Sequence, residues 1–144
     1  MELHPYIRRV QFYETDQMGV IHHANYIRWF EEARVDFTEQ LGYGYRHVEE
    51  QGISFAVLGV CCDYHSIVRF GESVAIWCSM PAFSATRMTI AYRITDAESG
   101  QLRASGETRH CYLNRENRPV SLKRAIPELY ELFMGLVAKP ESNP

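Results

Sequence analysis

The sequence has no excess of positive charge and no long apolar run. Its formal net charge is -3 at pH 7, and 23% of its residues are charged, so it lacks the basic surface that nucleic-acid-binding proteins present to phosphates. Its longest apolar stretches are far too short to span a bilayer. These absences predict that the protein neither binds nucleic acid nor carries a transmembrane segment.

A secretory leader and a zinc-binding cysteine pattern are also missing. The first five residues contain no basic patch followed by an apolar run, which argues for a cytoplasmic protein. None of the cysteines form a Cys-x-x-Cys pair, so we expect no metal site and reduced thiols that pack as small apolar residues. The cysteines are Cys61, Cys62, Cys78 and Cys111.

Length and composition fit a single domain. The chain has 144 residues, of which 46% are hydrophobic, and it contains no internal repeat or low-complexity segment. A chain of this size supports one hydrophobic core and leaves little room for a second. We therefore expect one domain over residues 1–144, with residues 139–144 as a frayed tail.

Two kinds of periodicity divide this domain into helices and strands. Apolar residues recur at steps of three and four from Tyr26 to Leu41, which is typical of one stripe of an α-helix, with Asn25 as its N-cap and Gly42 as its stop. A short exposed helix is expected over 46–51, and a terminal helix from Pro127. Runs rich in β-branched and aromatic residues predict strands at 6–13, 53–65, 73–80, 86–95 and 102–113.

This order of elements predicts an α+β fold. The last four strands follow one another without a helix between them, so we expect four consecutive antiparallel strands. One strand precedes the long helix, and a short helix ends the chain. The sheet is expected to cover the apolar stripe of the long helix.

The densest group of reactive side chains lies between the first strand and the long helix, at residues 13–26. A helix N-terminus offers unpaired N–H groups and the positive end of the helix dipole, which stabilise negative charge that develops on a carbonyl oxygen. The carboxylate of Asp16 precedes the first helical turn by a few residues. Asp16 and the amides near His23 therefore supply a base or nucleophile and an oxyanion donor, as acyl transfer requires.

Other interpretations of these residues are open at this point. An ordinary loop aspartate that forms an Asx turn is a second interpretation of Asp16. His22 and His23 are candidate metal ligands, although adjacent side chains diverge and no third ligand is spaced to meet them. The charged residues of the long helix are expected to form a solvated or salt-bridged face: Glu31, Glu32 and Arg34.

A longer sequence pattern in this region favours one of these interpretations. It reads Tyr13-Glu-Thr-Asp16-x-Met-Gly19-Val20-Ile-His-His23-x-Asn-Tyr26, followed by Trp29-Phe30-Glu31-x-x-Arg34. The pattern resembles the 4-hydroxybenzoyl-CoA thioesterase family of hotdog-fold proteins, and within it the general bacterial acyl-CoA thioesterases. The resemblance covers about residues 6 to 127 and includes 106–110 and 118–119.

The resemblance implies a hotdog fold, in which an antiparallel sheet of about five strands wraps around a long central helix. It also implies a homodimer or homotetramer whose subunits pair sheet edges, with active sites at the interface. In such a site Asp16 attacks the thioester of an acyl-CoA or activates water, and the amide of His23 polarises the carbonyl. No metal or organic cofactor is implied.

The resemblance further implies which residues contact the substrate. Gly19, Val20 and Tyr26 belong to the same motif as Asp16 and are expected to border the acyl group. A turn near the middle of the chain matches the region that touches pantetheine and nucleotide in relatives, and its arginine is a candidate partner for a CoA phosphate. The residues expected to bind in this turn are Ser84, Thr86 and Arg87.

The sequence departs from the family pattern at two places near the expected acyl pocket. Many relatives have a Tyr-x-x-Pro stretch where this chain has Tyr64 followed by Ile67, so the proline is lost. His22 stands where a tyrosine is common. Both changes are expected to alter which acyl group fits and to leave the carboxylate in place.

Two other functions remain as alternatives to acyl-CoA hydrolysis. One is a thioesterase that acts on acyl groups attached to an acyl-carrier protein, and the other is a protein that binds acyl thioesters without cleaving them. Dehydratases of the same fold are disfavoured because their histidine-containing helix signature is not visible. The intact Asp16 favours hydrolysis over binding alone.

Overall fold

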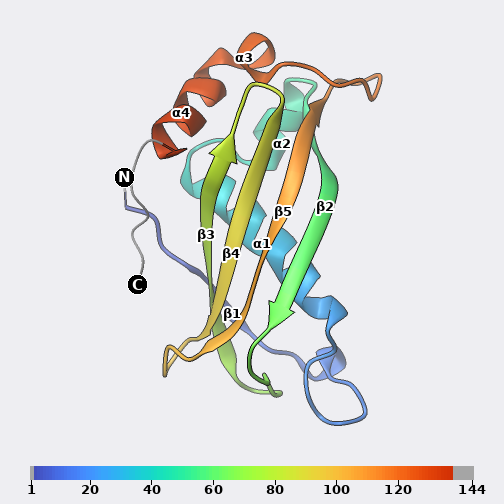
Figure 1. The fold of residues 1–144 in the computed structure, drawn as a ribbon, viewed down its shortest axis with the longest axis vertical. Helices are drawn as coiled ribbons and strands as arrows, with labels where there is room; N and C mark the ends of the chain where they lie inside the picture. The colour runs from blue at the N-terminus through green and yellow to red at the C-terminus, as the bar shows by residue number, and fades with distance from the viewer. Residues whose placement is uncertain (1, 138–144) are drawn as a thin grey trace.

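A five-stranded antiparallel sheet lies across one long helix in the computed structural model, which describes residues 2–137 (Figure 1). The strands are β1 (Tyr6–Arg9), β2 (Ser54–Tyr64), β3 (Ser73–Phe83), β4 (Arg87–Asp96) and β5 (Leu102–Leu113). The helices are α1 (Ala24–Gln40), α2 (Tyr45–Glu50), α3 (Leu122–Ala125) and α4 (Pro127–Val137). The α+β prediction, with a long helix and a short C-terminal one, is confirmed. The expected frayed tail, 139–144, lies outside the described residues.

The strand order differs from the predicted run of consecutive neighbours. The sheet reads β1-β3-β4-β5-β2, so β2 pairs with β5 and not with β3. The connection at 65–72 is therefore not a hairpin, because it must cross the end of the sheet past β5 and β4. The prediction was wrong here because an eight-residue connection fits either path, and the strand pattern carries no information about partners.

Two shorter elements also differ from expectation. The first strand ends at Arg9 and not at residue 13, since Phe12–Glu14 form a 3₁₀ turn. That turn is stabilised locally, because the Glu14 carboxylate accepts the N–H of Gln11 at 2.8 Å. The four-residue helix α3 was not anticipated, because it is too short to show a period.

The ends of α1 follow from local hydrogen bonds. At the C-terminal end, Gly42 has φ +84° and its N–H donates to Glu39 O, while the N–H of Tyr43 donates to Thr38 O. This is the Schellman arrangement, and it confirms Gly42 as the stop. At the other end the N-cap is His23, and the predicted N-cap, Asn25, lies inside the helix. Its side chain instead donates to the backbone oxygen of Glu14 at 2.9 Å.

The core is the apolar stripe of α1 packed on the inner face of the sheet. Trp29 and Phe30 are fully buried, and the Phe30 ring stacks on Tyr92 of β4 at 4.2 Å between centroids. Beneath Phe30, β5 carries Gly106, where a Cβ would lie 2.2 Å from the Cys61 carbonyl oxygen and 2.9 Å from the Phe30 ring. A side chain at position 106 would therefore force either the ring or the β2–β5 ladder to move.

The prediction that Arg34 lies on a solvated or salt-bridged face is wrong. Arg34 is buried, and its guanidinium donates to the hydroxyls of Tyr45 at 2.7 Å and Tyr92 at 3.0 Å.

The chain of hydrogen bonds that begins at Arg34 continues from Tyr92 through Thr108 to His110. Burial, together with the Arg34 cation, lowers the pKa of His110 to about 4, so its ring is neutral at pH 7. The spacing of charged residues along the helix did not reveal the burial of Arg34, because its guanidinium donates to tyrosine hydroxyls and not to carboxylates. Glu32 does form a salt bridge, with Arg8 at 2.8 Å.

Replacement of Gly106 by alanine is expected to destabilise the fold. The added methyl meets the Cys61 carbonyl and the Phe30 ring, so the free energy of unfolding should fall by about 1–3 kcal/mol, as for other overpacked cores. Gly135→Ala in α4 is the matched control, since its Cβ would contact nothing within 4 Å. That variant should be about 0.5–1 kcal/mol more stable. Urea denaturation of both variants tests this, and equal stability would contradict the packing described here.

Candidate active site

The segment between β1 and α1 is anchored by the buried carboxylate of Glu14, which is 2% exposed. Oε1 of Glu14 accepts a hydrogen bond from Arg8 Nη1 at 2.6 Å, and Oε2 accepts one from Trp29 Nε1 at 2.8 Å. The backbone oxygen of Glu14 accepts the N–H of His22 and the side-chain amide of Asn25, both at 2.9 Å. Glu14 therefore ties the strand, the helix and the loop between them together.

From this anchor the chain makes a tight turn that holds Asp16. The N–H of Asp16 donates to Val20 O at 2.8 Å, and the N–H of Gly19 donates to Asp16 O at 3.1 Å. Gly19 has φ +74°, which favours glycine at this point of the turn. Oδ1 of Asp16 accepts the N–H of Met18 at 2.8 Å, so the Asx turn considered from the sequence is present. That bond orients the carboxylate, and Oδ2 has no hydrogen-bond partner among residues 2–137.

The backbone that leads into α1 pairs some of its N–H groups and leaves others without an acceptor within residues 2–137. The N–H of Ala24 donates to Nδ1 of His22 at 3.1 Å, and the N–H of Asn25 donates to the His22 carbonyl at 3.0 Å. Within residues 2–137 the N–H of His23 donates to no acceptor. It lies at the N-cap of a 17-residue helix, where the helix dipole favours negative charge.

A pocket of about 340 Å³ brings these groups together. Four of the residues predicted for the site line it: Asp16, Val20, His23 and Tyr26. Gly19 lies in the turn between Met18 and Val20, which both line the same pocket. The geometry therefore unites the carboxylate, the free amide and apolar walls in one place.

One wall of the pocket comes from the end of β2 and the connection that follows it. Tyr64 donates its hydroxyl to the His23 carbonyl at 2.8 Å, and its ring meets Tyr26 edge-on at 4.9 Å between centroids. Burial raises the pKa of Tyr26 and that of Tyr64 to about 12. Both phenols are therefore protonated at pH 7, and Tyr64 acts as a donor.

The connection itself is held by Arg103, which sequence reasoning missed. The Arg103 guanidinium donates to the Ile67 carbonyl at 2.8 Å, to Glu72 at 3.1 Å and to Asp96 at 3.0 Å. It thus fixes the segment in which the family's proline is replaced by Ile67. The sequence pattern did not single Arg103 out, because β5 also carries Glu107 and Arg109.

The residues predicted to bind pantetheine lie at the other end of the sheet. Ser84, Thr86 and Arg87 form the β3–β4 turn, in which Ser84 Oγ accepts the N–H groups of Thr86 at 3.3 Å and Arg87 at 3.0 Å. In Figure 1 this turn lies near α3 at the top of the view, whereas the loop that precedes α1 lies at the bottom. Since β3 has 11 residues, the two ends are roughly 30 Å apart. One copy of the chain does not bring these three residues to Asp16.

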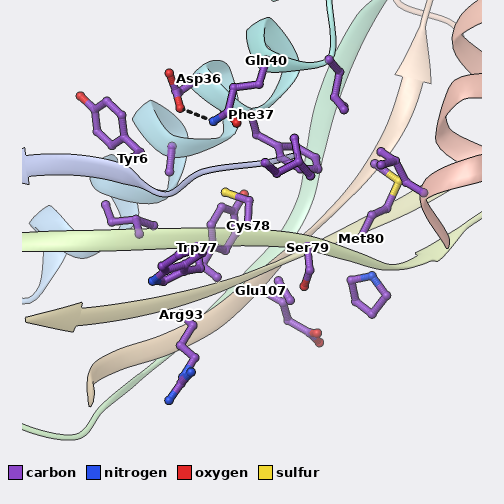
Figure 2. Close-up of a pocket in the computed structure, with 18 of the residues that line it drawn as sticks. Tyr6, Asp36, Phe37, Gln40, Trp77, Cys78, Ser79, Met80, Arg93 and Glu107 are labelled. Atoms are coloured by element: carbon purple, nitrogen blue, oxygen red, sulfur yellow. Dashed lines mark hydrogen bonds between the residues drawn. The ribbon is translucent and has the colours of Figure 1, made fainter. Parts of the chain in front are cut away.

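A larger hollow of about 1050 Å³ follows β3 away from this pocket (Figure 2). Its lining includes Tyr6, Asp36 and Gln40 on the helix side of β3, with a Gln40–Asp36 hydrogen bond of 2.7 Å, and Trp77 and Arg93 on the other side. None of the residues predicted for the site line it. The smaller pocket is therefore the candidate active site, because Asp16, with its carboxylate, and His23, with its unpaired amide, both line it.

Two further observations concern metal binding and membrane-spanning helices. In the described part of the chain, no group of three or more His, Cys, Asp or Glu residues is placed to hold a metal ion. No helix there is both long enough and apolar enough to cross a membrane.

Known proteins resemble this chain over most of its length. A family model described as the thioesterase-like superfamily matches residues 10–133. The acyl-CoA thioester hydrolase YbgC of Escherichia coli is 23% identical over 118 residues, which cover 82% of this chain and 88% of that protein.

Solved structures share the fold. A DHNA-CoA thioesterase from Staphylococcus aureus superposes with a TM-score of 0.90 at 31% identity, over 94% of this chain and 91% of that one. Slr0204 of Synechocystis, a 1,4-dihydroxy-2-naphthoyl-CoA thioesterase, has a TM-score of 0.81 at 20% identity, over 94% of this chain and 98% of that one.

The role of Glu14 as an anchor predicts a stability effect that Asp16 should not share. Glu14→Gln removes the buried charge opposite Arg8, so the free energy of unfolding should fall by about 2–4 kcal/mol. Glu32→Gln is the matched control, because Glu32 also binds Arg8 but its side chain is 36% exposed. That change should cost at most about 1 kcal/mol. Chemical denaturation would contradict the anchor role if the two variants were equally stable.

Proposed function

The chain belongs to the thioesterase-like superfamily and is a thioester hydrolase, and we propose that it cleaves acyl-CoA with Asp16 as its catalytic carboxylate. The observation that carries this proposal is the pairing of a partly free carboxylate with an unpaired amide in one pocket. Hydrolysis of a thioester requires these two parts: a group that adds oxygen to the carbonyl carbon, and a donor that stabilises the resulting oxyanion.

In the proposed mechanism, the thioester carbonyl oxygen accepts the N–H of His23. The dipole of α1 strengthens this interaction as negative charge develops on that oxygen. Asp16 Oδ2 then either attacks the carbonyl carbon or removes a proton from a water that attacks it. Both routes expel the CoA thiolate, consume one water and give the free acid. No step requires a metal or an organic cofactor.

The acyl group is proposed to lie against the apolar side of the same pocket. Val20, Tyr26, Tyr64 and Ile67 contribute that side. Because Arg103 holds the Ile67 carbonyl, this wall keeps its position although the connection lacks the family's proline. Aromatic and aliphatic side chains both line the pocket, so a test of substrates should include aromatic and aliphatic acyl groups.

A dimer through β2 is proposed from the character of the two sheet edges. At one edge β1 has four residues, two of them arginines, which is how proteins blunt a free edge. At the other edge β2 has 11 residues, and the side chains of Val57, Leu58 and Val60 are 43–54% exposed. A long apolar edge of this kind pairs with another strand or aggregates.

This dimer would also complete the substrate site. Two copies of β2 that pair antiparallel about a two-fold axis place Tyr64 of one copy near Ser54 of the other. The Asp16 pocket of one copy then lies toward the end of the second copy that carries the β3–β4 turn. Ser84, Thr86 and Arg87 are thereby proposed to bind the pantetheine and phosphate groups of CoA across the interface, with Arg87 as the phosphate partner.

Asp16→Asn tests the catalytic carboxylate. Asparagine retains an Oδ1 that accepts the Met18 N–H, so the turn and the fold should be preserved. Turnover should fall by at least about 10², because the base or nucleophile is lost, and substrate binding should change far less. Release of free thiol, measured over a panel of aromatic and aliphatic acyl-CoAs, gives both quantities. Gln17→Ala, an exposed neighbour on the same turn, is the control and should retain turnover. Wild-type turnover in Asp16→Asn would refute the proposal.

Val60→Lys tests the dimer. A lysine ammonium placed at the centre of the proposed β2–β2 contact should shift the protein toward monomer and lower its activity together. Ile7→Lys is the control, since Ile7 is similarly exposed but lies on β1, at the other edge. Sedimentation equilibrium at micromolar concentration measures the change. An active wild-type monomer under these conditions would contradict a site shared between two copies.

A further inference from the structure

The peptide between His23 and Ala24 is held at both of its polar ends by side chains. Its carbonyl accepts the Tyr64 hydroxyl at 2.8 Å, and its N–H donates to His22 Nδ1 at 3.1 Å. These two side chains come from different elements, since Tyr64 is the last residue of β2 and His22 precedes α1. Neither is the carboxylate or the amide that acts on the thioester.

The peptide on the other side of His23 is held as well. The His22 carbonyl accepts the N–H of Asn25 at 3.0 Å, and in the preceding peptide the N–H of His22 donates to Glu14 O at 2.9 Å. A trans peptide is planar, and its N–H points opposite to its C=O. The Asn25–His22 hydrogen bond therefore fixes the direction of the His23 N–H, which belongs to the same peptide plane.

From this arrangement we propose that Tyr64 and His22 are positioning residues for the His23 amide, an inference that rests on the proposed thioesterase function. With the planes before and after its Cα both fixed, His23 is held at φ −57° and ψ −30°. Its N–H is then fixed in direction and has no acceptor within residues 2–137. If either hydrogen bond is lost, the second plane can rotate and move Asn25 with it, which weakens the Asn25–His22 hydrogen bond that directs the His23 amide toward the carbonyl oxygen.

Each of the two hydrogen bonds requires a particular protonation form of its side chain. For His22 to accept the Ala24 N–H at Nδ1, its ring must carry its proton on Nε2. It also stacks on the His23 ring at 4.3 Å between centroids, which keeps the ring in place. The Tyr64 hydroxyl must be protonated to donate, and its ring is braced edge-on by Tyr26. Each of the two hydrogen bonds is thus supported by aromatic packing, and a substitution can remove either one alone.

The experiment removes each hydrogen bond while keeping the ring. Tyr64→Phe and His22→Phe should each lower kcat about tenfold, a fraction of the 10²–10³ typical for loss of a whole oxyanion donor, with KM changed less than about twofold. The double variant should lose little more than the worse single one, because both side chains hold the same peptide. His22→Asn should recover most of the turnover lost in His22→Phe, since its Oδ1 occupies the place of Nδ1. Tyr43→Phe, which loses an exposed hydroxyl bond to Glu128, is the control.

A spectroscopic measurement separates positioning from general damage to the fold. In the Asp16→Asn background, where bound acyl-CoA is not turned over, the infrared stretch of the thioester carbonyl reports the hydrogen bond from His23. Addition of Tyr64→Phe or His22→Phe should move that stretch toward its value in free substrate, while the melting temperature stays close to that of Asp16→Asn. Wild-type kcat in both phenylalanine variants, or an unchanged stretch, would overturn the inference. Failure of the proposed function itself would be recognised separately, as full turnover in Asp16→Asn.

Discussion

A buried carboxylate cannot remain without partners, and Glu14 meets that requirement with groups from three parts of the chain. Arg8 approaches it from β1, Trp29 from α1 and the Gln11 N–H from the turn before it. Because each partner is directional, the end of β1 and the beginning of α1 have one relative position. The loop that carries Asp16 begins directly after Glu14, so its starting point is fixed by the same contacts.

Two carboxylates only two residues apart therefore have opposite roles. Glu14 is enclosed, and both of its oxygens are occupied by donors, which leaves it no capacity to act on a substrate. Asp16 is partly exposed, and its turn occupies only Oδ1. The difference comes from the 3₁₀ turn, which directs residue 14 inward and lets the chain emerge before residue 16. If Asp16 were inactive, Glu14 would still be a poor substitute.

Much of the fold could be predicted because it depends on periodicity. The stripe from Tyr26 to Leu41 and the stop at Gly42 correspond closely to α1, since both depend on local spacing and backbone conformation. Strand partners could not be predicted, because the pairing of β2 with β5 is decided by packing across the sheet. For the same reason the buried hydrogen bonds of Arg34 were missed, as they join residues up to 58 positions apart.

The candidate site shows the same division between local and distant interactions. Asp16, Val20, His23 and Tyr26 lie within 11 positions of one another and were recognised as a group, and one pocket does contain them. Tyr64 of β2 lines that pocket, Arg103 of β5 holds the connection that forms one of its walls, and only the fold places these two residues there. The β2 strand that supplies Tyr64 is also the edge strand of the sheet, and the Tyr64 hydroxyl binds the His23 carbonyl. In the proposed dimer, subunit association and the geometry of the proposed oxyanion site are therefore coupled through a single strand, β2.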